Sequence, residues 1–175
     1  MKTVYTSPHN WVTVKEENGI YWAERKGVNS VAVIPYRWAG PFIEFMQHEE
    51  PIIAHQKFAA KNIGAIGGSI DKDLPLADIA CEELLEEGGY DISFTKMIPL
   101  GRMFCTTQSS EQVFLYTCNL TDVIQGEMQL EPSEMAQGKH DNHWVKGDWK
   151  TVNKCLDPRY IVAVSRIKEY LNYDG

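Results

Sequence analysis

The sequence predicts a protein of the α/β or α+β class. Short apolar runs bounded by turn residues recur along its first two thirds, one helical segment lies among them, and an amphipathic helix ends the chain. The 175 residues, 43% of them hydrophobic, suffice for one domain with a sizeable core.

The N-terminal third reads as a series of short strands. Residues 11–14 and 20–23 are apolar or β-branched runs, and the Glu-Asn-Gly sequence between them is a turn signal typical of a hairpin. Residues 31–34 are a buried-strand run, and residues 42–46 form the next strand.

The middle of the chain alternates strand and helix. Residues 63–70 are apolar and glycine-rich, which predicts a strand that runs into a tight loop. Residues 75–87 are helical, and the Gly-Gly pair after them ends the helix. Residues 97–100 and 113–116 are further strands.

The last helix begins at Asp157 and Pro158, because Asp suits the N-cap and Pro the first turn. Its apolar positions recur at steps of three and four residues: Ile161, Val164, Ile167 and Leu171. Residues 122–156 give no clear pattern and no role.

Composition and charge exclude several classes of protein. The formal net charge is −7, which does not suit a general nucleic-acid coat protein. No apolar run approaches the roughly 20 residues of a membrane helix, and the first residues do not resemble a secretory signal. Four cysteines without a CxxC pair favour neither a zinc knuckle nor a disulfide scaffold, so a reduced, cytoplasmic compartment is expected.

The predicted helix is strongly acidic. Residues 73–95 hold seven acids and no Lys or Arg. On a helical wheel Glu83 and Glu87 fall within the apolar face, and their like charges one turn apart cost about 0.2–0.5 kcal/mol. The members of that face are Leu76, Ile79, Ala80 and Leu84.

Two interpretations of these acids stand side by side. A solvated acidic face is the ordinary one, but it fits poorly because an unpaired carboxylate on an apolar side is costly. A bound cation resolves the conflict, since carboxylates one turn apart are hard oxygen ligands that suit Mg²⁺ or Mn²⁺. Mg²⁺ favours phosphate oxygens as its remaining ligands, so the helix indicates a metal site for a phosphorylated substrate.

Residues 68–90 read GSIDKDLPLADIACEELLEEGGY, which resembles the Nudix box of the Nudix hydrolases, G-x5-E-x7-R-E-U-x-E-E-x-G-U with U apolar. Leu74 stands where the family has its first Glu, and Glu82 where it has Arg; in the family these two typically form a pair. The matching positions are Gly68, Glu83, Leu84, Glu86, Glu87, Gly89 and Tyr90.

The resemblance implies an α/β/α sandwich around a mixed sheet, and cleavage of the pyrophosphate bond of a nucleoside diphosphate linked to another group. The ADP-ribose pyrophosphatase branch is nearest, so ADP-ribose or a nucleotide sugar is the expected substrate. Residues 1–30 would then be N-terminal strands that build a homodimer, and residues 31–175 the Nudix domain. The similar segments are residues 19–36, 65–71 and 109–116.

The same resemblance implies roles for the acids. Glu83 and Glu87 would hold Mg²⁺ or Mn²⁺ together with the backbone carbonyl of Gly67. Glu86 would be a further ligand or the catalytic base, and Glu111 a base or water-orienting residue. The alternatives are that Gly67 and Gly68 form a simple turn and that Glu111 is a solvated loop carboxylate.

Basic and aromatic residues supply substrate contacts in this hypothesis, although each is individually more typical of a surface charge or a core ring. Residues 140–143 (HDNH) resemble a transition-metal pair, but a polar loop is the preferred interpretation because no cysteine or helical spacing accompanies them. The substrate candidates are Arg37, Arg102, Lys57 and Lys61 for phosphate, and Trp22, Trp11, Tyr21 and Trp38 for base stacking.

Other functions stay open at this point. Because Leu74 and Glu82 depart from the box, a non-catalytic Nudix-fold nucleotide sensor is one alternative. A hydrolase of capped RNA ends or nucleoside triphosphates is another, although the acidic net charge argues against long RNA.

Overall fold

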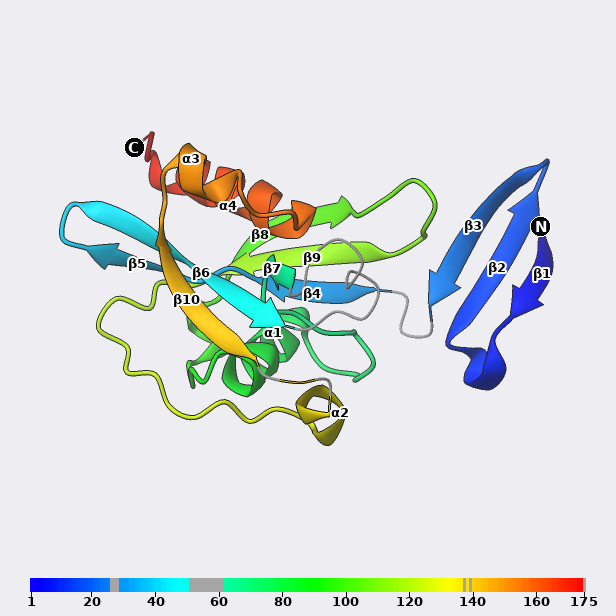
Figure 1. The fold of residues 1–175 in the computed structure, drawn as a ribbon, viewed down its shortest axis with the longest axis horizontal. Helices are drawn as coiled ribbons and strands as arrows, with labels where there is room; N and C mark the ends of the chain where they lie inside the picture. Colours follow the sequence, from blue (N-terminus) through cyan, green and yellow to red (C-terminus); the bar gives the residue numbers. More distant parts are fainter. Residues whose placement is uncertain (26–28, 51–61, 137, 139, 175) are drawn as a thin grey trace.

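The computed structural model describes residues 1–25, 29–50, 62–136, 138 and 140–174 (Figure 1). The predicted phosphate ligands Lys57 and Lys61 lie outside the described residues. The strands are β1 (Lys2–Thr6), β2 (Val12–Glu17), β3 (Ile20–Arg25), β4 (Ser30–Val33), β5 (Tyr36–Ala39), β6 (Phe42–Glu50), β7 (Asn62–Gly64), β8 (Ile98–Phe104), β9 (Gln112–Thr117) and β10 (Asp141–Lys146). The α-helices are α1 (Leu76–Glu86), α2 (Pro132–Met135), α3 (Trp149–Val152) and α4 (Pro158–Leu171).

The described strands form three sheets. β1, β2 and β3 make an antiparallel sheet of their own, and β10, β6 and β5 make a second antiparallel sheet to which β7 adds along β6. The third sheet has the order β4-β9-β8, with β4 parallel to β9 and β8 antiparallel to it. This third sheet is therefore mixed.

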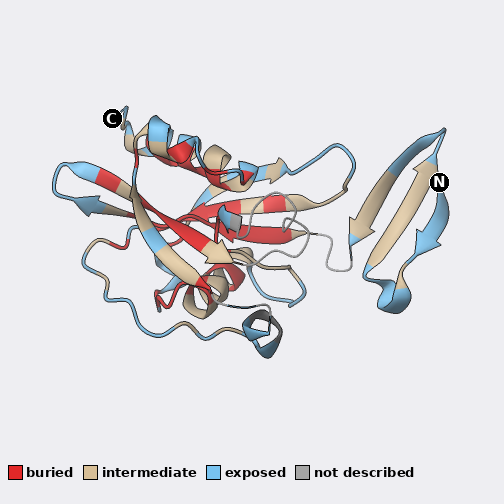
Figure 2. Ribbon diagram, in the orientation of Figure 1, coloured by how far each residue is buried: buried red, intermediate tan, exposed pale blue. Residues whose placement is uncertain are grey.

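Helices α1 and α4 cover opposite faces of the sheets, as Figure 1 shows. β4 is buried along its whole length (Figure 2), and its side chains alternate between two cores. Val31 and Val33 pack in a cluster with residues of α1, whereas Ala32 packs in a second cluster with residues of α4. The fold is therefore the expected α/β/α sandwich.

Both predicted helices are present. α1 covers Leu76–Glu86, and α4 begins at Pro158 after Asp157, whose side chain accepts a hydrogen bond from the Arg159 N–H at 2.8 Å. The strands predicted near residues 12, 20, 31, 98 and 113 are also present, with β1 and β5 in addition.

Two strand predictions differ from the structure. β6 continues four residues beyond Met46, to Glu50. The polar-loop interpretation of residues 140–143 is wrong, because Asp141–Lys146 is a strand, β10, that pairs with β6. Antiparallel pairing with a nine-residue neighbour satisfies its backbone groups, which the local polar sequence alone does not reveal.

The N-terminal sheet is attached through β3. The Ala23 N–H donates to the Gln108 carbonyl at 2.9 Å, and the Ser110 N–H donates to the Ala23 carbonyl at 3.3 Å. No helix in the described part of the chain has the length and apolar character needed to cross a bilayer.

Candidate functional site

A glycine loop runs beside β4. The N–H groups of Val33 and Val31 donate to the carbonyls of Ile66 and Gly68, at 2.8 and 3.0 Å. In this antiparallel arrangement the backbone groups of the intervening Gly67 point away from β4. The Gly67 N–H donates to Glu87 Oε2 at 3.0 Å. A Cβ at Gly67 would lie 2.4 Å from the Val31 carbonyl oxygen, so close packing on β4 requires glycine here.

Glu83 and Glu87 from the end of α1 face this loop. Glu87 is 4% exposed and accepts the hydrogen bond from Gly67. The Glu83 carboxylate lies against Gly68, since a Cβ at Gly68 would be 1.9 Å from Glu83 Oε1. The prediction that these two acids share the inner side of the helix is confirmed. Glu86 is half-buried, and its carbonyl accepts a hydrogen bond from the Gln129 N–H at 2.8 Å.

Glu111 reaches the same end of β4 from the residue that precedes β9. The Ser30 hydroxyl donates to Glu111 Oε1 at 2.8 Å, and Arg25 Nη1 lies 3.7 Å from Oε2. Ser30 also forms a β-bridge with Ser69, the neighbour of Gly68. The structure therefore places Glu111 beside the glycine loop, although 81 residues separate it from Ser30.

Lys72 and Glu82 form an ion pair between the loop and α1, with Lys72 Nζ 2.7 Å from Glu82 Oε2. The hydrogen bond to Glu82 raises the pKa of Lys72, and the charges of Glu86 and Glu83 add to this effect. Leu74 is 42% exposed. The loop thus supplies the cation and the helix the carboxylate of this pair, the reverse of the Glu and Arg in the Nudix pattern.

The other predicted contacts lie in two regions. Arg102 donates to the side chain of Gln112 at 2.8 Å, one residue beyond Glu111. The Trp22 Nε1–H donates to Glu24 at 3.2 Å. The next residue, Ala23, is the one through which β3 forms hydrogen bonds with the 108–110 segment. Arg37 lies on the β5–β6 hairpin instead, 2.7 Å from Glu44 and 4.4 Å above the ring of Trp144.

A group that sequence reasoning noted only through His140, as part of a possible transition-metal pair it set aside, lies at the end of β6. His48, Glu50 and His140 place one ligand atom each within 4.8 Å of the others, and both histidines are buried. Among the described residues this is the one such group of three, so Glu83, Glu86 and Glu87 are not gathered as closely. The available signal in the sequence was the polar run, residues 47–50, that follows the apolar part of β6. Its ability to hold a metal depends on the pairing of β6 with β10.

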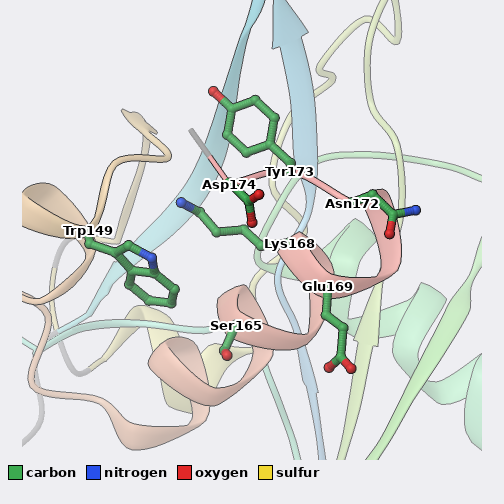
Figure 3. Close-up of a pocket in the computed structure, with 7 residues that line it drawn as sticks. All are labelled: Trp149, Ser165, Lys168, Glu169, Asn172, Tyr173 and Asp174. Atoms are coloured by element: carbon green, nitrogen blue, oxygen red, sulfur yellow. The ribbon is translucent and has the colours of Figure 1, made fainter.

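A hollow of about 400 Å³ opens at the C-terminal end of α4 (Figure 3). Lys168 lies there between two rings, with Nζ 4.7 Å from the Trp149 ring and 5.5 Å from that of Tyr173. Burial lowers the pKa of Lys168. None of the acids of α1 lines this hollow, which lies beside the other helix of the sandwich.

Three thiols, the buried Cys118 and Cys155 and the half-buried Cys81, have raised pKa values. Burial raises the pKa of Cys118 to about 12, and those of Cys81 and Cys155 to about 11. A thiol must ionise to act as a nucleophile, and these remain protonated at neutral pH.

The chain is similar in fold to a solved structure described as "Crystal structure of ADP compounds hydrolase". The TM-score is 0.69 and the sequence identity 17%, with 98% of this chain and 91% of that chain covered. No family model matches the sequence, and no curated protein matches it. At this identity the likeness shows the fold: the chain is an α/β/α sandwich of the kind adopted by that hydrolase.

Proposed function

We propose that this protein is a divalent-metal-dependent, Nudix-type hydrolase that cleaves the pyrophosphate bond of a nucleoside diphosphate linked to another group. ADP-ribose or another ADP compound is the first expected substrate. The observation that carries the proposal is that two carboxylates of α1 contact the glycine loop. The Glu83 carboxylate lies against Gly68, and the Glu87 carboxylate accepts a hydrogen bond from the Gly67 N–H. The description of the structural neighbour as a hydrolase of ADP compounds supports the substrate class.

The donor set fits Mg²⁺ or Mn²⁺. Glu83, Glu87 and Glu86 offer carboxylate oxygens, and the Gly67 carbonyl, which points away from β4, offers a backbone oxygen. Mg²⁺ usually keeps several waters and binds through one or two carboxylates, so only part of this donor set need contact the ion directly. When bound, such an ion polarises a phosphoryl oxygen and lowers the pKa of a coordinated water.

Glu111 is the proposed base or water-orienting residue. The hydroxyl of Ser30 occupies Oε1 and fixes the carboxylate, so Oε2 is the atom that would take the proton of an attacking water. Arg25, whose side chain is 55% exposed, contributes a weaker, screened attraction at 3.7 Å. Glu86 remains the alternative base.

Trp22 and Arg102 are the substrate contacts we propose on the side of Glu111, because the neighbour of Trp22, Ala23, bonds to residues 108 and 110, and Arg102 donates to Gln112. Trp22 would stack on the base from the N-terminal sheet, and Arg102 would hold phosphate from β8. Arg37 is a weaker proposal, because it would have to leave Glu44 and the face of Trp144 to reach a phosphate.

The N-terminal sheet is the proposed surface of a homodimer. Its exposed large hydrophobic residues are Val4, Tyr5, Trp11, Ile20 and Tyr21. Light scattering of the wild-type chain should give the mass of a dimer, and Ile20→Ser should weaken it, while Phe94→Ser outside this sheet should not. A monomeric wild-type chain would contradict this assignment.

The function is tested by product analysis with Mg²⁺ or Mn²⁺ over ADP-ribose, NADH, UDP-glucose and diadenosine polyphosphates. Glu83→Gln and Glu87→Gln should each lower kcat/KM by about 100-fold or more, since a ligand of a charge-stabilising ion is lost. Glu82→Gln is the matched control on the same helix and should stay within about threefold of wild type. Nucleotide binding without any product would indicate a sensor and overturn the proposal.

A further inference from the structure

Two buried histidines meet at the end of β6, outside the glycine loop. His48, on β6, is 1% exposed, and His140, just before β10, is 4% exposed. His48 Nε2 lies 3.2 Å from His140 Nδ1. Glu50 brings a carboxylate oxygen within 4.8 Å of one ring nitrogen of each histidine, and Glu87 Oε2 lies 4.0 Å from His48 Nε2.

Asn142 determines which nitrogen of His48 carries the proton. The Asn142 amide group donates to the Glu87 carbonyl at 2.8 Å and contacts Met128 Sδ, so its Oδ1 is the end that faces His48. His48 Nδ1, 3.0 Å from that oxygen, must therefore be the donor. Neutral His48 then presents the lone pair of Nε2 toward His140, which is how an outer partner prepares a histidine for metal binding.

The spacing of the two nitrogens suits a shared ion. Two metal–nitrogen bonds of about 2.05 Å that span this 3.2 Å gap subtend about 100° at the metal, near the tetrahedral value. A hydrogen bond would explain the histidine pair alone. It does not explain why the carboxylates of Glu50 and Glu87 also lie close to these rings, where negative charge favours a cation.

We propose that His48, His140 and Glu50 bind a transition-metal dication of the Zn²⁺ type. Two imidazole nitrogens and one carboxylate are the ligands of many zinc sites with an open fourth position, whereas Mg²⁺ prefers oxygen ligands alone. Glu50, partly exposed at the end of β6, gives the ion a route from solvent. The site is distinct from the oxygen ligands at Gly67 and Gly68, and Glu87 lies between the two.

Cobalt titration tests this site without any substrate, so its outcome is independent of the proposed hydrolase activity. The chain is stripped with a chelator and titrated with Co²⁺ in excess Mg²⁺, and the visible ligand-field absorption is recorded. The wild-type chain should bind one Co²⁺ with a low-symmetry spectrum and release it to Zn²⁺. Asn142→Leu should weaken binding by about 10–100-fold, because it removes the partner that fixes His48.

Four variants separate this site from other ligands. His140→Gln and Glu50→Gln should abolish the cobalt spectrum, whereas His143→Gln, on β10 and with a side chain that is 47% exposed, should preserve it. Glu83→Gln should preserve it as well. X-ray absorption at the zinc edge of the wild-type chain should show histidine nitrogens at about 2.0–2.1 Å. A wild-type chain without the spectrum, a spectrum that survives His140→Gln, or a purely oxygen zinc shell would each overturn the proposal.

Discussion

Replacing Gly68 by alanine should separate metal binding from stability. The added Cβ would lie 1.9 Å from Glu83 Oε1 and 2.3 Å from its Cδ, so the Glu83 carboxylate must leave the loop. If the displaced Glu83 side chain is held about 30° away from a preferred rotamer, this costs about 0.5–1.5 kcal/mol. Alanine recovers about 0.4–1 kcal/mol by restricting the unfolded chain, because Gly68 does not adopt a left-handed φ. The net change in the free energy of unfolding should stay within about 1 kcal/mol.

Gly67→Ala should instead lower the free energy of unfolding. Its Cβ would meet the backbone carbonyl of Val31 at 2.4 Å, and a backbone atom in a buried strand cannot swing aside. Overpacking of this kind costs about 1–3 kcal/mol. Gly126→Ala is the control, since its Cβ would meet the nearest atom at 3.4 Å, an ordinary contact.

Two measurements check this pair of variants: urea unfolding, and Mn²⁺ binding followed by electron paramagnetic resonance. Gly68→Ala should weaken Mn²⁺ binding by about 10–100-fold, as loss of an oriented ligand group does, at nearly wild-type stability. The reasoning is refuted if Gly68→Ala binds Mn²⁺ like the wild type, or if its stability falls by as much as that of Gly67→Ala.

Three further predictions concern the acid, the ion pair and a thiol. If Glu111 is the base, Glu111→Gln should lower kcat by about 10²–10⁴-fold, and Ser30→Ala by less than that; equal activity of Glu111→Gln and wild type would assign the role elsewhere. A double-mutant cycle on Lys72 and Glu82 should give a coupling of about 0.2–1 kcal/mol that fades with salt, because both groups are about half exposed; a coupling above about 2 kcal/mol would contradict this. Burial raises the pKa of Cys118 to about 12, so between about pH 9 and 12 the unfolded chain binds fewer protons than the folded chain. The free energy of unfolding should therefore fall by up to about 1.4 kcal/mol per pH unit in this range. Urea unfolding in reductant should show a shallower fall with pH for Cys118→Ala.

The acids of α1 illustrate what local spacing predicts. Glu83 and Glu87 are one turn apart, so their shared inner face follows from helical geometry alone, and the structure confirms it. The start of α4 was predicted as directly, because the side chain of Asp157 caps the helix through the N–H of Arg159, two residues later. The α/β/α layering was expected from the resemblance and the order of elements.

β10 illustrates what local spacing does not predict. Residues 140–143 are polar, and only their pairing with β6 turns them into a strand. The same pairing brings His140 to His48, 92 residues earlier in the chain. No periodicity of three, four or two residues records such a contact, since it depends on the register between distant strands.

The sequence by itself determined the two long helices α1 and α4, the buried run of β4 and the shared face of Glu83 and Glu87, because these features depend on neighbours within a few residues. Tertiary structure alone decided that Glu111 joins the glycine loop through Ser30 and that the polar end of β6 meets His140. The physical reason is that sheet register and the packing of separate layers set contacts between distant segments, and the hydrophobic pattern constrains which face each strand presents but not which partner it meets.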